Sequence, residues 1–157
     1  MKRPRAPSGR AAFLLAQVGA HAAQRFGERV QALGLTPADA GVLRLVAAAP
    51  GRSQQDLAEQ LGLSPSRVVA LIDELEGKGL LERRRNPDDR RTYALALTAE
   101  GTDRLAQVSR LAAEHEADLC AALDDGERAI LAGLLRRIAE QQGLKPGIHP
   151  GYRNLGS

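Results

Sequence analysis

Residues 53–101 carry the pattern that decides the fold, and they read SQQDLAEQLGLSPSRVVALIDELEGKGLLERRRNPDDRRTYALALTAEG. A helix is predicted to begin at Ser53, because an acidic residue follows three positions later, and to end at Gly62. A second helix is predicted to begin at Ser64 and Pro65, since serine is a favoured N-cap and proline suits the first helical position. Two short strands follow, so the order indicates a helix-turn-helix with a β-hairpin attached to it.

The spacing of small and branched residues supports this interpretation. Ala58 provides the small contact that two crossing helices need, and Gly62 tolerates the backbone of a sharp turn. Val68 is then expected to fill the angle between the helices. In the second helix the apolar residues recur at helical spacing, which places on its inner face Val68, Leu71, Ile72 and Leu75.

The outer face of this second helix is the candidate surface for the major groove of DNA. Its residues are Ser64, Pro65, Ser66, Arg67, Val69 and Ala70. Arg67 is the one residue there that can form a bidentate pair with guanine, and the two serines can donate to phosphate or to a base edge. Val69 and Ala70 can contact thymine methyl groups, although a single exposed aliphatic side chain is also ordinary on a protein surface.

The hairpin provides a second group of candidate DNA contacts. Turn residues at 86–89 separate the two predicted strands, over 80–85 and 92–98. The charged residues of interest are Arg83, Arg84, Arg85, Asp89, Arg90 and Arg91. An arginine at the tip is expected to enter the minor groove, where negative potential is concentrated. We expect Asp89 to form a salt bridge with Arg91 or Arg83 that fixes the hairpin; the alternative is a solvated, charged hairpin.

The rest of the chain is predicted to be helical. Apolar periodicity and end signals predict a long helix over 10–32, a buried helix over 37–49, a long helix from Thr98 whose stripe continues to Ala122, and a last helix after Asp124. The start of the chain imitates a secretory signal peptide, but the stripe from Leu14 to Leu33 continues through the apparent cleavage site. The fold class is therefore mainly α with a small β-wing (α+β).

Three regions are expected. Residues 1–34 form a basic arm and a first dimerisation helix, residues 35–101 form the winged helix-turn-helix lobe, and residues 102–157 form further dimerisation helices and a C-terminal arm that includes Leu144, Ile148 and Tyr152. The long helices have apolar stripes too wide for the small lobe to cover, which favours a homodimer. No apolar run is long enough to span a membrane.

Composition narrows the functional classes. The net charge of +3 over 157 residues is weak support for nucleic-acid binding by itself. The single cysteine, Cys120, excludes an internal disulfide and a cysteine-based zinc site and suits the cytoplasm. We expect no cofactor and no metal, because His21, His115 and His149 lack the spacing of a metal site. No catalytic motif appears, so an enzyme is not expected.

From Leu35 to Gly101 the chain resembles the MarR family of winged-helix regulators. The motifs that carry this resemblance are LTP at 35–37, DLA at 56–58, LGLS at 61–64, LExKGL at 75–80, ER at 82–83, NPDDRR at 86–91 and LTAEG at 97–101. The resemblance implies an obligate homodimer on a palindromic operator in double-stranded DNA. It also implies repression of its own gene and a neighbouring operon, relieved by a small aromatic or phenolic ligand.

Some features of the chain leave alternatives open. Family members often carry Ser or Thr followed by Arg where this chain has Val69 and Ala70, so the resemblance does not supply an operator sequence. Gln17, His21 and Arg25 are candidates to orient the carboxylate of an effector, the alternative being a polar contact at the dimer interface. Two other functions remain: a redox- or metal-responsive regulator acting through Cys120 or the histidines, and a winged-helix module that binds protein.

Overall fold

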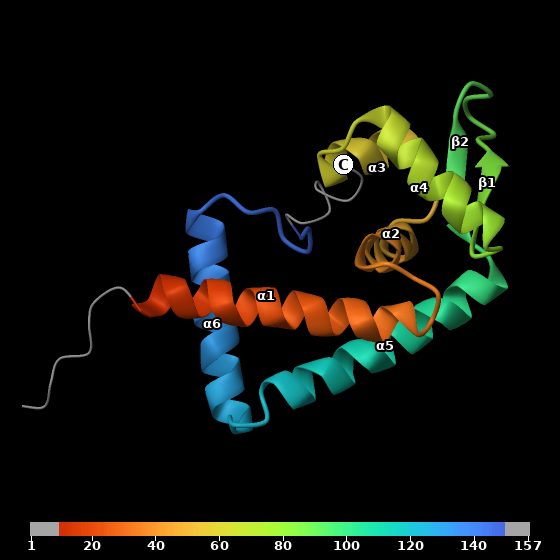
Figure 1. Ribbon diagram of the computed structural model, residues 1–157. Helices are drawn as coiled ribbons and strands as arrows, with labels where there is room; N and C mark the ends of the chain where they lie inside the picture. Colours follow the sequence, from red (N-terminus) through yellow and green to blue (C-terminus); the bar gives the residue numbers. More distant parts are fainter. Residues whose placement is uncertain (1–9, 150–157) are drawn as a thin grey trace, which may run out of the picture.

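The computed structural model describes residues 10–149, which form six helices and a two-stranded antiparallel sheet. In chain order the elements are α1 (Arg10–Gln31), α2 (Pro37–Ala48), α3 (Gln54–Leu61), α4 (Pro65–Gly77), β1 (Leu81–Arg85), β2 (Tyr93–Leu97), α5 (Ala99–Leu119) and α6 (Asp125–Gln141). The predicted class, mainly α with a small β-wing, is confirmed (Figure 1). The basic arm at residues 1–9 and the end of the C-terminal arm, including Tyr152, lie outside the described residues.

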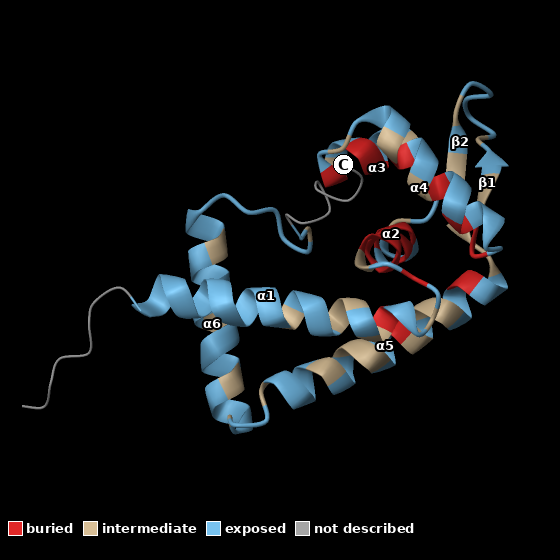
Figure 2. Ribbon diagram, viewed as in Figure 1, coloured by how far each residue is buried: buried red, intermediate tan, exposed pale blue. Residues whose placement is uncertain are grey.

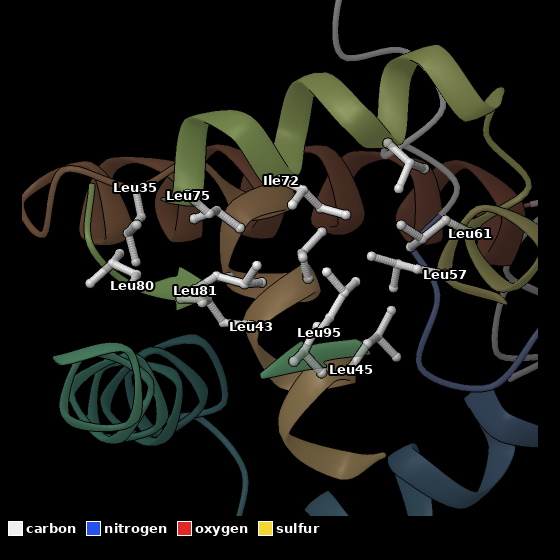
Figure 3. Packing of buried hydrophobic residues seen from close by; sticks show 14 of the residues in the cluster. Leu35, Leu43, Leu45, Leu57, Leu61, Ile72, Leu75, Leu80, Leu81 and Leu95 are labelled. Atoms are coloured by element: carbon white, nitrogen blue, oxygen red, sulfur yellow. The ribbon is translucent and has the colours of Figure 1, made fainter. Parts of the chain in front are cut away.

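The hydrophobic core lies in the lobe built from α2, α3, α4 and the hairpin. Eight residues of α2 are buried, and Figure 2 shows this helix as the most deeply buried element. Side chains from α3, α4 and β2 meet it from different sides, as Leu57, Ile72 and Leu95 show in Figure 3. The predicted inner stripe of α4 is confirmed, since Val68, Ile72 and Leu75 are fully buried and Leu71 packs against them half-buried.

Side-chain caps explain where most of the helices begin. Capping boxes start α2, α3 and α6, with Thr36, Ser53 and Asp124 as their respective N-caps. Ser64 occupies the N-cap position of α4, but its side chain makes no capping hydrogen bond. Its Oγ atom lies 3.2 Å from Oγ of Ser66 instead. Pro65, which needs no backbone hydrogen-bond acceptor, therefore does more than Ser64 to start this helix.

A buried carboxylate joins the start of α2 to the end of α4. Asp39 is fully buried, and its Oδ2 atom accepts from the backbone N–H of Thr36 at 2.9 Å and from Nζ of Lys78 at 3.3 Å. Lys78 also donates to Glu74 at 3.0 Å and to the carbonyl of Gly34 at 2.9 Å. Burial lowers the pKa of Lys78, but its hydrogen bonds and charge interactions with Glu74 and Asp39 outweigh this effect and raise the pKa above its ordinary value.

The junction between the hairpin and α5 is closely packed. Oγ1 of Thr98 donates to the carbonyl of Gly79 at 2.6 Å and accepts from the backbone N–H of Gly101 at 3.0 Å. A Cβ atom on Gly101 would lie 1.8 Å from the carbonyl oxygen of Leu80. The LTAEG motif therefore brings the first turn of α5 against the backbone that enters β1.

The predicted length of α5 needs a correction. We expected its apolar stripe to continue to Ala122, but the helix ends at Leu119 and Cys120 is its C-cap. The chain has to leave the helix there because the capping box at Asp124 starts α6 only a few residues later. α6 has no buried residue and makes no extensive contact with another described helix or strand.

Candidate nucleic-acid interface

The structure places the predicted major-groove residues together around the first two turns of α4. Gly62, at φ 65° and ψ 32°, turns the chain between α3 and α4, which confirms the expected role of this glycine. The side chains around the start of α4 are exposed except for Arg67, which is half-buried. Val69 is 38% exposed and does not belong to the buried core. The outer face of α4 therefore carries an apolar side chain at its surface.

Arg83 braces the hairpin against the two helices and does not lie at its tip. Its Nε atom donates to Gln54 of α3 at 2.8 Å, and its two terminal nitrogens donate to Asp73 of α4 at 2.6 Å and to Glu76 at 2.9 Å. The side chain is only 18% exposed. Burial lowers the pKa of Arg83, but its bonds to Asp73 and Glu76 outweigh burial and raise the pKa above its ordinary value.

The expected salt bridge from Asp89 to Arg83 or Arg91 is wrong. The guanidinium of Arg83 is held by α3 and α4, and Asp89 instead accepts the backbone N–H of Arg91 at 3.0 Å. Asn86 similarly accepts the backbone N–H of Asp88 at 3.0 Å. The loop at 86–92 is thus shaped by short polar side chains that bond to nearby backbone, which is the usual chemistry of asparagine and aspartate in turns.

The remaining hairpin arginines are more exposed than Arg83. Arg84 pairs with Glu82 on the same strand, and 65% of its side chain is exposed. Arg85, Arg90 and Arg91 are exposed at the end of the hairpin, which projects beyond α4 (Figure 1). The structure therefore separates the predicted group of arginines into one brace and a cationic tip.

The hairpin is also attached to the lobe through the residues just before α3, a contact that sequence patterns do not indicate. The backbone N–H of Gly51 donates to the carbonyl of Leu95 at 3.2 Å, and the backbone N–H of Leu95 donates to the carbonyl of Arg52 at 2.8 Å. Ser53 and Ala94 form an isolated antiparallel β-bridge. These three residues before α3 extend the sheet by one short edge. Strand periodicity cannot indicate such an edge, because it has too few residues to alternate.

Cavities are also found along α1 and α5. A polar cavity of about 190 Å³ is lined by His21, Arg25, Arg29, His115, Asp118 and Leu119. Of the three predicted effector-binding residues it contains His21 and Arg25, whereas Gln17 is not part of its lining. Burial, followed by the charges of Arg29 and Arg25, lowers the pKa of His115, whose ring lies 5.6 Å from that of Phe26.

A second, mostly apolar cavity of about 240 Å³ lies where α1, α2 and α5 meet. Its lining residues are Phe26, Ala40, Gly41, Arg44, Leu105, Val108, Ser109 and Ala112. Sequence patterns do not indicate this cavity, because its lining comes from three helices that are not consecutive in the chain. Arg44 is the only charged residue of this lining.

The regulatory alternatives based on cysteine or metal gain no support from the geometry. Cys120 is half-buried at the end of α5, as expected of a small apolar residue. Within residues 10–149 there is no group of three or more His, Cys, Asp or Glu residues that could hold a metal ion. None of the helices in this part of the chain is long and apolar enough to cross a membrane.

Comparison with known proteins agrees with this arrangement. A model of the MarR family matches residues 33–92. A protein of Thauera aromatica, named as a transcriptional regulatory protein for the hcr operon, is 38% identical over 113 residues, which are 72% of this chain and 68% of that protein. The chain belongs to the MarR family. This MarR-family protein is accordingly a DNA-binding transcriptional regulator and not an enzyme.

Solved structures support DNA binding directly. The transcriptional repressor CouR bound to a 23-mer DNA duplex is 36% identical, with a TM-score of 0.74, over 86% of this chain and 99% of that one. A mutant MarR from E. coli complexed with operator DNA is 26% identical, with a TM-score of 0.69, over 81% of this chain and 91% of that one. This MarR-family regulator therefore has the fold that binds duplex DNA in both complexes.

Proposed function

We propose that this MarR-family regulator is a homodimeric repressor of its own gene and of a neighbouring operon, acting in the cytoplasm on a palindromic operator. The observation that carries the dimer is the unburied apolar surface of α6. Five of its large hydrophobic residues are between 38% and 64% exposed, namely Ile130, Leu131, Leu134, Leu135 and Ile138. Phe13, Leu14, Leu15 and Val18 of α1 are similarly exposed.

A second copy of the chain is the occupant that these surfaces fit. Exposed apolar area of this extent is rare on a monomer, and MarR-family proteins work as dimers. We assign dimerisation to residues 10–34 and 102–141, and DNA binding to residues 35–101. Repression is supported by the names of similar proteins, which include CouR and the transcriptional repressor MdtR of Bacillus subtilis, 31% identical over 75% of this chain and 66% of that protein.

Two surfaces of each lobe are proposed to contact DNA. The N-terminal part of α4 enters the major groove, where Arg67 reads guanine and Val69 and Ala70 contact thymine methyl groups. The cationic tip of the hairpin, with Arg90 and Arg91, follows the minor groove. Arg83 acts on DNA only indirectly, because its bonds to α3 and α4 set the direction in which the hairpin projects.

The apolar cavity between α1, α2 and α5 is proposed as the site of a small aromatic or phenolic effector that relieves repression. Its apolar wall suits a ring, and Arg44 can pair with an anionic group. The polar cavity at His21 and Arg25 suits such a ligand less well. Its lining includes Arg25, Arg29 and Asp118 and offers little apolar wall for a ring.

The roles of α4 and the hairpin can be separated by two substitutions. Arg67→Ala is expected to cost ~1–3 kcal/mol of binding to the preferred sequence and to relax base preference, because a bidentate base contact is lost. Arg90→Ala is expected to weaken binding evenly across DNA sequences and to reduce the salt dependence of the affinity, because it removes a positive charge that interacts with the phosphates of DNA. Titration of preferred and scrambled duplexes at several salt concentrations measures both effects. An unchanged ratio of preferred to scrambled affinity in Arg67→Ala would show that α4 does not read the bases.

A further inference from the structure

The segment after α6 has a defined conformation. Gly143, at φ 70°, ends the helix, and the backbone N–H of Leu144 donates to the carbonyl of Ala139 at 3.0 Å. This is the hydrogen bond by which a left-handed glycine commonly terminates a helix. A turn follows, with Pro146 and Gly147 as its central residues. In this turn the backbone N–H of Ile148 donates to the carbonyl of Lys145 at 3.2 Å. Proline followed by a glycine of positive φ, here 73°, is typical of a type II turn.

This turn is docked on the DNA-binding lobe. Arg44 of α2 donates to the carbonyl of Gly147, and Nζ of Lys145 donates at 3.3 Å to the carbonyl of Glu59, near the end of α3. Ile148 is half-buried and packs against the hydrophobic core of the lobe. Figure 1 shows the segment running from the end of α6 back toward α2 and α3.

The docked turn joins two parts of the molecule that otherwise touch little. Because α6 makes no extensive contact with another described element, it is connected to the lobe through α5 at one end and through this turn at the other. We propose that residues 144–149 are a strap that positions the lobe relative to α6, with Arg44 as its latch. The strap rests on the proposed dimer, since α6 of two copies would set the distance between the two α4 helices.

Arg44 connects the strap to the proposed effector cavity. Its guanidinium contacts the strap at Gly147, and the residue also lines the apolar cavity. A Cβ atom on Gly147 would lie 3.0 Å from Nη1 of Arg44, and the positive φ of Gly147 disfavours any side chain there. Substitution at Gly147 is therefore a way to loosen the latch without substituting any residue that lines the cavity.

The test compares DNA duplexes that differ in the spacing of two half-sites. The half-sites come from duplexes selected by the full-length protein from a random pool, and one or two base pairs are then inserted between them. Each inserted base pair rotates one half-site by about a tenth of a turn, so the wild-type dimer is expected to lose about tenfold or more in affinity. Gly147→Val and Ile148→Asp are expected to reduce this loss to about threefold or less, because a loosened lobe can follow the displaced half-site.

Gly133→Ala on α6, where an added Cβ has no neighbour within 4 Å, is the matched control and should behave as wild type. Thermal unfolding of every variant establishes that the lobe is folded. Strap variants that keep the wild-type spacing dependence, or that lose affinity equally for all spacings, would overturn the proposal. A wild-type protein indifferent to spacing would instead overturn the proposed symmetric dimer, and the strap with it.

Discussion

Gly101→Ala is expected to destabilise the DNA-binding lobe by about 3 kcal/mol or more, because the added Cβ would lie 1.8 Å from the carbonyl oxygen of Leu80. The obstacle is backbone and not a movable side chain. Relief therefore requires the first turn of α5 to move away from β1. That movement would break the hydrogen bonds by which Thr98, the N-cap of α5, donates to the carbonyls of Gly79 and Leu80.

Chemical denaturation followed by circular dichroism measures this effect. Gly77→Ala is the matched control, because Gly77 is the last residue of α4 and an added Cβ there meets nothing within 4 Å. Alanine at that position should leave stability unchanged or raise it by up to about 1 kcal/mol. If Gly101→Ala unfolds at the same denaturant concentration as Gly77→Ala, then the close packing of α5 on β1 is not required.

Leu134→Glu is expected to convert the dimer into a folded monomer and to lower operator affinity by about 10²-fold to 10⁴-fold. Leu134 is 49% exposed in one chain, so a carboxylate there does not disturb the core of the lobe. Two buried copies of that carboxylate would be costly in a dimer interface. Separate lobes would then bind each half-site without the gain that comes from linking two binding events.

Sedimentation and titration of operator DNA test this prediction together. Ala129→Glu places the same carboxylate on α6 about 170° away from the centre of the apolar stripe, by the helical period. This control should remain dimeric and keep its affinity. A dimeric Leu134→Glu protein would show that the apolar face of α6 is not the dimer interface.

Much of the fold could be predicted from local sequence. Helix starts at Thr36, Ser53 and Asp124 depend on residues three positions apart, and the turn at Gly62 depends on a single residue. Apolar periodicity was enough to identify the buried face of α4 because it recurs within one helix. The end of α5 was misplaced because helical periodicity continues past Leu119, whereas the start of α6 decides where the chain turns.

The candidate site was harder to predict, because its geometry depends on contacts between distant residues. Arg83, Arg84 and Arg85 are equivalent in the sequence, but only Arg83 faces Gln54, Asp73 and Glu76, which belong to other elements. Strand alternation explains part of this difference, since neighbouring side chains point to opposite faces. Which residues bind Arg83 follows only from the packing of α3 and α4 against the hairpin.

The strap and the apolar cavity were beyond the reach of sequence patterns for the same reason. The proline and glycine at 146–147 indicate a turn. Nothing near them in the sequence indicates that the turn forms hydrogen bonds with Arg44 and Glu59. Residues Leu144 and Ile148 were expected to pack within an arm. Ile148 does pack against the lobe, whereas Leu144 is 48% exposed.

A hydroxyl-radical footprint of the wild-type protein on DNA upstream of its own gene tests the central claim most directly. The claim is that a symmetric dimer places two α4 helices in adjacent major grooves and two hairpin tips beside them. The predicted result is a pair of protected regions related by two-fold symmetry, with centres ~34–36 Å apart on one face of the duplex. A single protected region, or protection without two-fold symmetry, would contradict the account.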